Sequence, residues 1–248
     1  MSKIFDALRK AEQEPNPLLL VEAPVLARTD RHPRDQRTQE REFSTLSTSV
    51  QSYFARQTEG KILLVAGCTE REGTTYVASH LARKLALQTG EPVLCVDGNF
   101  HDPGLTRTFQ VKNGLGMADI YDGGKPRDVA TLLWNGDQQN LYFLGTGRRR
   151  IVPGAFFDSP EFDALLASFR HTFRFTVFDS SPLLKHADAM HLAARTDGVI
   201  FVVRAGNLKR EVIRKGIEMV ESVNAPVLGA VLNRRRFAIP SLVYKLIS

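Results

Sequence analysis

Short apolar runs alternate with amphipathic segments from about residue 60 to residue 235. The runs, most of them apolar on both faces, cover residues 61–67, 92–97, 141–145, 175–179, 198–205 and 227–233. Apolar residues recur at helical spacing between them, in residues 75–89, 159–170, 186–194 and 208–223. Strands that bury both faces and alternate with helices are typical of parallel sheets. The pattern predicts an α/β fold with a mostly parallel sheet of six or seven strands and helices on both faces.

The N-terminal part of the chain has a different pattern. Ile4, Phe5 and Leu8 fall on one side of a short amphipathic helix, which is marginal in water unless it docks on something. We expect these side chains to dock on a partner protein or the membrane face, with packing on the rest of the chain as the alternative. Prolines and charges dominate the segment that follows, which favours a flexible linker. The predicted parts are an amphipathic helix in residues 1–12, a linker in residues 13–38 and a domain in residues 39–248.

The composition is that of a globular protein. The chain has 248 residues, of which 43% are hydrophobic and 24% charged, with a formal net charge of +6. These values exclude wholesale disorder and fibrous classes, and two cysteines cannot form a disulfide framework or a zinc site by themselves. No apolar run approaches the ~18–20 residues that span a bilayer, and no signal-peptide pattern is present. We expect a cytoplasmic protein, in a position to lie peripherally at the inner face of the cell membrane.

Two further features give weaker indications. Residues 148–150 and 234–236 are arginine triplets, which suit phosphates or an anionic membrane surface but equally form a solvated basic face. Aromatic residues do not interleave with them, so no specific nucleic-acid partner is expected. Among the six histidines, only His186 lies at ligand spacing from a carboxylate, that of Asp188, and the sequence does not favour a histidine metal site.

Residues 67–75 form a strand-to-helix transition, Gly-Cys-Thr-Glu-Arg-Glu-Gly-Thr-Thr. In an open parallel sheet, ligands collect at the carboxyl ends of the strands, and backbone N–H groups at a helix start bind phosphate. A complete phosphate loop adds a lysine for the β and γ phosphates and a hydroxyl for magnesium. Gly73 and Thr75 match this pattern, whereas Thr74 stands where the lysine belongs and Cys68 where the first glycine belongs. The residues alone leave two interpretations open, a degenerate phosphate loop and an ordinary turn.

Two of the apolar runs end in an aspartate. Asp97 ends the run 92–97, and Asp179 ends the run 175–179 in the form of a Walker B carboxylate. A carboxylate at a strand end beside a phosphate loop can hold magnesium or orient a nucleophile, although it can also cap the next turn. Asp97 and Asp179 are therefore the candidate catalytic carboxylates.

The order of these motifs resembles the bacterial tyrosine kinases of capsule and exopolysaccharide synthesis. That family lies within the deviant phosphate-loop ATPases, which include the cell-division and chromosome-partition ATPases. The resemblance runs from about residue 40 to residue 235, and residues 1–11 resemble the N-terminal helix of stand-alone members. It rests on the ordered segments 65–75, 80–86, 92–97, 114–116, 176–182, 188–189, 197–203 and 228–233.

The resemblance implies a three-layer phosphate-loop NTPase fold with ATP and Mg²⁺ as cofactors. Thr75 is then the magnesium hydroxyl, and Asp97 and Asp179 are the carboxylates near the metal. Asn233 is then an adenine contact, and Arg71, Gly73 and Thr74 complete the nucleotide-binding segment. The implied partner is a membrane polysaccharide co-polymerase or another protein of the export machinery.

The chain departs from the family pattern at several steps of the kinase cycle. The catalytic lysine is replaced by Thr74, and Arg71 is the loop cation that could substitute for it. After Asn233 the only tyrosine is Tyr244, so the C-terminal tyrosine cluster is missing. The remaining departures are Glu70 in the loop, Asn99 for the second carboxylate, His101 for an arginine, and Arg41, Ser44 and Ser47 for the oligomerisation motif Glu-x-x-Arg-x-x-Arg.

These departures favour a degenerate, pseudokinase-like protein with a regulatory or scaffolding role in exopolysaccharide or capsule biosynthesis and export. Binding of ATP and Mg²⁺ is expected to be weak or absent. Two alternatives remain open. One is an active ATP-dependent protein-tyrosine autokinase, and the other is a relative of the partition ATPases that binds DNA or membrane through its basic surface.

Overall fold

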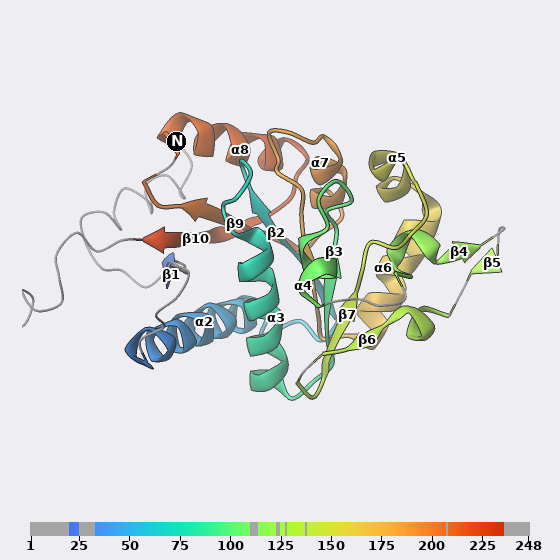
Figure 1. Ribbon diagram of the computed structural model, residues 1–248, viewed down its shortest axis with the longest axis horizontal. Helices are drawn as coiled ribbons and strands as arrows, with labels where there is room; N and C mark the ends of the chain where they lie inside the picture. The colour runs from blue at the N-terminus through green and yellow to red at the C-terminus, as the bar shows by residue number, and fades with distance from the viewer. Residues whose placement is uncertain are drawn as a thin grey trace, which may run out of the picture.

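The computed structural model describes residues 20–24, 33–109, 114–122, 125–126, 128–136, 138–206 and 208–235. Within these residues, eight strands form one sheet in the spatial order β1-β10-β9-β2-β8-β3-β7-β6 (Figure 1). Neighbouring strands run parallel, except that β6 is antiparallel to β7 at one edge. The strands are β1 Leu20–Pro24, β2 Lys61–Gly67, β3 Val93–Asp97, β6 Trp134–Asn135, β7 Leu141–Leu144, β8 Phe175–Asp179, β9 Gly198–Arg204 and β10 Val227–Arg235.

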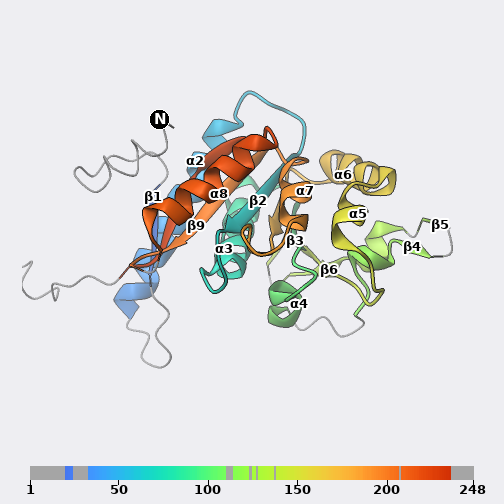
Figure 2. The same cartoon turned by 90° about the horizontal axis from the view of Figure 1, so that it is seen from above.

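Helices cover both faces of the sheet. Seen from above in Figure 2, α7 and α8 lie on one face, with α2 and α3 beyond the sheet. A small separate hairpin pairs β4, Tyr121–Asp122, with β5, Lys125–Pro126. In the described part of the chain, no helix is both long enough and apolar enough to cross a membrane. The helices are α2 Pro33–Tyr53, α3 Thr74–Thr89, α4 Gly104–Thr108, α5 Pro153–Phe157, α6 Pro160–Thr172, α7 Asp188–Ala193 and α8 Arg210–Ser222.

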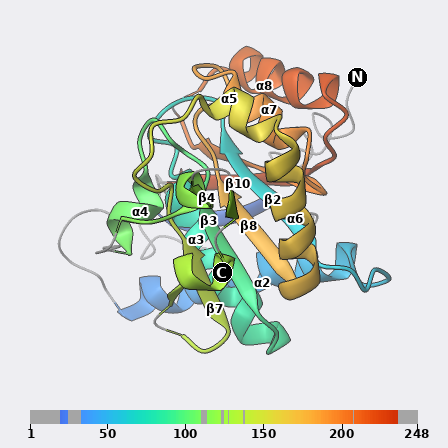
Figure 3. The ribbon, with the colours of Figure 1, turned by 90° about the vertical axis from the view of Figure 1, so that its right-hand side faces the viewer.

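The central strand β2 contributes to two hydrophobic cores. Ile62, Leu64 and Ala66 pack with residues of α6, α7 and α8, and α6 runs beside β8 on that face (Figure 3). Leu63 and Val65 pack instead with residues of α2 and α3. Successive side chains of a strand point to opposite faces, so a strand between two helical layers must be apolar throughout. This explains why β2 reads as an unbroken apolar run.

The predicted α/β fold is confirmed, and each of the six predicted apolar runs is a strand of the sheet. The structure differs from the prediction at the edges of the sheet, where it adds β1 and β6. It also places β1 and the start of α2 inside residues 13–38, which the sequence predicts to be a linker. β1 pairs in parallel with β10 from Leu20 opposite Ala230. An edge strand needs only one neighbour, so a short segment in a proline-rich context can form one.

The predicted amphipathic helix of residues 1–12, with Ile4, Phe5 and Leu8, lies outside the described residues. So does the segment after β10 that carries Tyr244. The docking role of the N-terminal helix therefore stays a prediction.

The parallel register brings the candidate groups to one edge of the sheet. Asp97 at the end of β3 lies opposite Asp179 at the end of β8. Asp179 in turn lies opposite Val65, two residues before the end of β2. The loop between β2 and α3 therefore begins beside both aspartates.

Candidate functional site

The loop from Cys68 to Gly73 turns sharply into α3. Gly73 precedes the helix with a φ of 96°, in the left-handed region, and Arg71 has a φ of 62°. The Gly73 carbonyl accepts a hydrogen bond from the Val77 N–H at 3.0 Å, as the first turn of the helix requires. This combination of a glycine turn and a helix start is the backbone arrangement that binds phosphate.

The side chain of Glu72 is buried inside the loop and accepts hydrogen bonds from other residues of the loop. Its side chain is only 1% exposed, and its Oε2 accepts a hydrogen bond from the Cys68 N–H at 2.8 Å. Its Oε1 accepts one from the Thr69 hydroxyl at 2.9 Å. Burial raises the pKa of Glu72 despite these donors. The carboxyl group therefore stabilises the shape of the loop while placing an acidic group inside it.

Asn233 supports the loop from β10. Its Nδ2 donates a hydrogen bond to the Glu72 carbonyl at 2.7 Å, and the side chain is 2% exposed. A Cβ added at Gly73 would lie 2.0 Å from the same Nδ2, so only glycine leaves room for this contact. The resemblance implies an adenine contact for Asn233, and the structure shows its amide N–H bound to the loop backbone.

Asp179 and Thr75 form the centre of the candidate site. The Thr75 hydroxyl donates a hydrogen bond to Asp179 Oδ2 at 2.5 Å. The other carboxylate oxygen, Oδ1, is buried and has no hydrogen-bond partner among the described residues. Burial raises the pKa of Asp179 to about 8, and the neighbouring Asp97 contributes in the same direction. A buried carboxylate with an unpaired oxygen beside a hydroxyl is a ligand set that suits Mg²⁺.

Asp97 is held by the segment that follows β3. Its Oδ2 accepts two hydrogen bonds from Thr106, one from the backbone N–H and one from the hydroxyl, both at 2.8 Å. Its Oδ1 accepts one from the Asn99 N–H at 3.2 Å. Burial raises the pKa of Asp97 to about 6, although the Thr106 hydrogen bonds act in the opposite direction. Asp97 is therefore engaged by α4 in this structure, while Asp179 keeps an unpaired oxygen.

Two residues of this site are missed by the sequence analysis, Thr106 and Gly104. A Cβ added at Gly104 would lie 2.6 Å from the Thr75 hydroxyl oxygen, so α4 approaches the first turn of α3 closely. No sequence motif indicates this, because the contact joins segments that only the packing of α4 against α3 brings together.

The loop lacks a cation at the position where a phosphate loop carries its lysine. Thr74 is the first residue of α3 and carries no positive charge. Arg71 is exposed, and the side chain of Lys185, after β8, forms an ion pair with Glu70 on the loop. The arginine triplet at residues 148–150 is exposed in the segment after β7.

The site residues fit magnesium better than they fit the phosphates. Thr75 and Asp179 would supply oxygen ligands to such an ion, with Asp97 beside them, and Gly73 leaves the start of α3 open to an anion. The cationic side chain that would neutralise the β and γ phosphates is missing at position 74, while Glu70 and Glu72 add acidic groups to the loop.

We compared the sequence of the chain with those of known proteins. No protein-family model matches the chain. The chain is 25% identical over 202 residues to the tyrosine-protein kinase CpsD of Streptococcus agalactiae, a match that covers 81% of this chain and 86% of CpsD. It is 26% identical over 182 residues to the succinoglycan biosynthesis transport protein ExoP of Rhizobium meliloti, covering 71% of this chain and 22% of ExoP.

Solved structures share the fold. The kinase domain of the Escherichia coli tyrosine kinase ETK has a TM-score of 0.76 at 20% identity, over 92% of this chain and 97% of that domain. The septum site-determining protein MinD from Pyrococcus horikoshii, complexed with Mg-ADP, has a TM-score of 0.56 at 19% identity, over 76% of this chain and 77% of MinD.

The sheet order and the loop between β2 and α3 give the chain an α/β fold of the phosphate-loop NTPase type, which MinD shares. In sequence, the chain is a relative of the bacterial tyrosine kinases, as its ordered motifs indicate.

Proposed function

We propose that this chain is a degenerate tyrosine-kinase-like protein that regulates or scaffolds exopolysaccharide or capsule biosynthesis and export. The single observation that carries the proposal is Thr74 at the start of α3, where a phosphate loop needs its lysine. A lysine in this position acts mainly on the charge that develops during phosphoryl transfer, so its loss impairs catalysis more than binding. The rest of the scaffold, with Gly73, Thr75 and Asp179, is retained.

The named relatives support the biological setting. CpsD is a tyrosine-protein kinase, and ExoP is a succinoglycan biosynthesis transport protein. By this similarity, we propose that the chain acts in the cytoplasm at the inner face of the membrane. Its partner would be a membrane polysaccharide co-polymerase or another protein of the export machinery, reached through the apolar side chains of residues 1–12.

Nucleotide binding is proposed to be weak or absent. If Mg²⁺ binds, Thr75 and Asp179 would hold it, with Asp97 beside them, and the ion would neutralise phosphate charge. Asp179 keeps the unpaired oxygen that such an ion needs. Glu70 and Glu72 oppose a triphosphate, and neither Arg71 nor Lys185 stands at the lysine position.

Calorimetry with ATP and Mg²⁺ tests this proposal on the full chain. The wild-type protein should bind ATP weakly or not at all, and Thr74→Lys should raise the affinity about tenfold or more, equivalent to ~1.4 kcal/mol. The matched control is Leu87→Lys, which adds the same charge to the same helix at an exposed position far from the loop. This control should leave ATP binding as in the wild type.

Labelling with radioactive ATP separates the proposal from the active-kinase alternative. We expect no tyrosine autophosphorylation in the wild type, and little in Thr74→Lys, because Asn99 replaces a carboxylate and Tyr244 is the only tyrosine after β10. Wild-type protein that labels itself and loses the label in Asp179→Ala would instead establish an active autokinase. The partition-ATPase alternative predicts DNA binding that falls steeply with salt, which a mobility shift at two salt concentrations would reveal.

A further inference from the structure

A cluster of three metal-ligand side chains lies beside the phosphate loop, outside the groups discussed above. In the described part of the chain, His101, His186 and Asp188 form the one group of three such residues, and one ligand atom from each lies within 4.8 Å of the others. His101 follows β3, whereas His186 and Asp188 follow β8. His101 and Asp188 are 87 residues apart in sequence, which is why spacing along the chain does not indicate the cluster.

The carboxylate of Asp188 is fixed in its orientation. The Ser181 hydroxyl donates a hydrogen bond to Oδ2 at 3.0 Å, and His101 Nε2 lies 3.0 Å from Oδ1. Asp188 is 8% exposed. Metal-binding carboxylates are commonly held by such a second hydrogen bond, because it leaves one oxygen aimed at the ion.

The two imidazole rings are aligned with each other. The rings of His101 and His186 stack with centroids 3.7 Å apart and an interplanar angle of 13°. The nitrogen lone pairs of parallel rings do not converge on one point, so one of the two rings must turn out of the stack before both can bind the same ion. His101 is exposed and His186 half-buried, so an ion bound here would be reached from solvent.

We propose that His101, His186 and Asp188 bind a divalent transition-metal ion, of which Zn²⁺ is the best match. Two imidazole nitrogens and one carboxylate oxygen form a three-ligand set with an open fourth position, a combination that zinc accepts. Two ligands that each lie ~2.1 Å from zinc are at most ~4.2 Å apart. The ligand atoms are therefore close enough for one ion, once the exposed ring of His101 turns out of its stack on His186.

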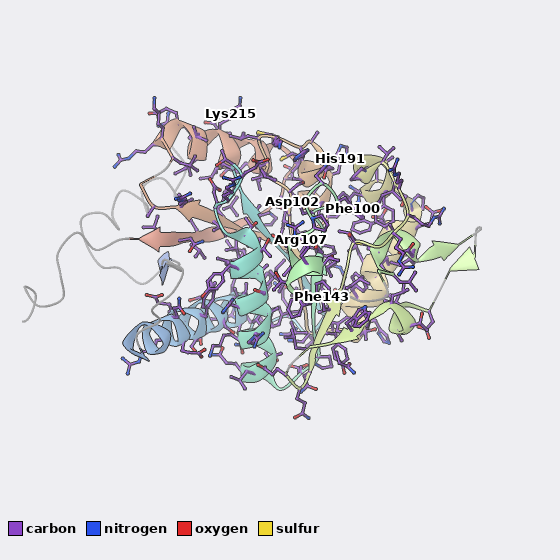
Figure 4. All side chains as sticks on the ribbon, viewed as in Figure 1. Phe100, Asp102, Arg107, Phe143, His191 and Lys215 are labelled. Atoms are coloured by element: carbon purple, nitrogen blue, oxygen red, sulfur yellow. The ribbon has the colours of Figure 1, made fainter. Side chains whose placement is uncertain are left out.

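The ion would link the segment after β3 to the segment between β8 and α7. Both segments leave the sheet at the edge where Asp97 and Asp179 lie, and Figure 4 shows Phe100 and Asp102 of the first segment at this edge. The bound metal would therefore restrain the loops that flank the phosphate loop. This inference does not depend on nucleotide binding.

A second histidine–aspartate pair nearby provides the control. His191 on α7, labelled in Figure 4, has its Nδ1 2.6 Å from Asp158 Oδ2. The third side chain at this pair is the cation of Arg195, whose Nη1 lies 2.9 Å from Asp158 Oδ1. A guanidinium cannot ligate a metal ion and repels one, so this pair should not bind zinc.

Zinc titration of the chelator-treated full chain, without nucleotide, tests the proposal by calorimetry. We expect one Zn²⁺ per chain at micromolar concentration or tighter. His101→Arg and His186→Gln should each weaken binding at least tenfold, and His191→Gln should leave it unchanged. His101→Arg can keep a charge pair with Asp188, so it should fold, and its melting temperature without metal checks this.

Co²⁺ serves as a second probe, since its visible absorption reports ligand number and geometry. The wild type should give the intense bands of a four-coordinate site, and His101→Arg should not. No zinc binding by the wild type, or equal binding by the wild type and His101→Arg, would overturn the proposal. Because nucleotide is absent from these experiments, their failure would leave the proposed pseudokinase function untouched.

Discussion

At the scale of single residues, several carboxyl groups in this chain are buried without a cation beside them. Glu42 on α2, which is half-buried, is a case outside the candidate site. Its Oε2 is buried and has no hydrogen-bond partner among the described residues, and burial raises the pKa of Glu42 to about 7. Below about pH 7, the folded protein therefore favours the protonated form of this side chain.

Replacing Glu42 with glutamine tests this directly. A raised pKa in the folded state contributes stability that is complete below the unfolded value of about 4.5 and is lost as the pH rises through 7. Glu42→Gln should therefore match the wild type near pH 5 and exceed its free energy of unfolding by about 1 kcal/mol at pH 8, a discounted value because the carboxyl is half-buried. Urea unfolding at four pH values measures it.

The control for this experiment is Glu40→Gln on the same helix, since Glu40 is exposed and pairs with Lys84. Its difference from the wild type should not grow between pH 5 and pH 8. A Glu42→Gln curve parallel to that of the wild type would contradict the assignment of a raised pKa to Glu42.

The sequence predicts some residues of the site and not others, for a physical reason. The positions of Asp97 and Asp179 are predictable because the carboxyl ends of parallel strands lie at the same edge of the sheet, independently of the loop conformations. The hydrogen bond of Asn233 to Glu72, and those of Thr106 to Asp97, depend on how a loop turns and where a short helix packs. His101 joins His186 and Asp188 for the same reason, since only the fold brings their loops together.

At the scale of elements, α3 has a left-handed glycine at each end, and the two differ in their surroundings. Gly73 before the helix has a φ of 96°, and an added Cβ would meet Asn233. Gly90 after the helix has a φ of 68°, and an added Cβ would meet nothing within 4 Å. Alanine at Gly90 would therefore add backbone strain alone, whereas alanine at Gly73 would add both strain and a steric clash.

Alanine at these two glycines should destabilise the protein unequally. Gly90→Ala forces an L-residue into the left-handed region, which costs ~1–2 kcal/mol. Gly73→Ala adds displacement of Asn233 from the Glu72 carbonyl, for a total on the order of 3 kcal/mol or more. Thermal and urea unfolding measure both. Adding Asn233→Ala to Gly73→Ala should cost less than the sum of the two single effects. Equal losses at Gly73 and Gly90 would show that Asn233 does not constrain the loop.

Long, strongly patterned elements are those that the sequence predicts well. β2 is buried along all seven of its residues. Complete burial requires apolar side chains throughout, so the strand is easily recognised in the sequence. β6 has two residues, and β1 lies at the other edge with a single neighbour. Such edge strands are stabilised by backbone pairing with one strand, which imposes little pattern on their side chains.

At the scale of the whole molecule, residues 1–12, which the sequence predicts to be an amphipathic helix, are expected to act separately from the domain. Deleting residues 1–12 should leave the melting temperature nearly unchanged and abolish partner recruitment in cells, because its apolar face is proposed to dock outside the chain. Differential scanning calorimetry and co-purification with the export machinery measure the two effects. A large loss of thermal stability would show that Ile4, Phe5 and Leu8 pack on the domain instead.

The residues on the surface of α2 allow a prediction of the oligomeric state. The resemblance to the tyrosine kinases implies an oligomerisation motif, Glu-x-x-Arg-x-x-Arg, and here Arg41, Ser44 and Ser47 stand in its place. Ser47 is 0% exposed, and its hydroxyl accepts a hydrogen bond from Gln51 Nε2 at 3.2 Å. Gln51 in turn donates to Gln88 on α3 at 2.8 Å. This face of α2 is therefore engaged within the chain, and the charged groups for ring contacts are missing.

Light scattering at micromolar concentration should accordingly give the mass of a monomer or a small oligomer. Placing an arginine at the buried position, Ser47→Arg, should lower the melting temperature by several degrees, because a charge would enter the interface of α2 and α3. It should not produce a larger particle. A ring-sized particle formed by the wild type would contradict the prediction. Rings would then form through contacts that do not need the charged residues of this motif.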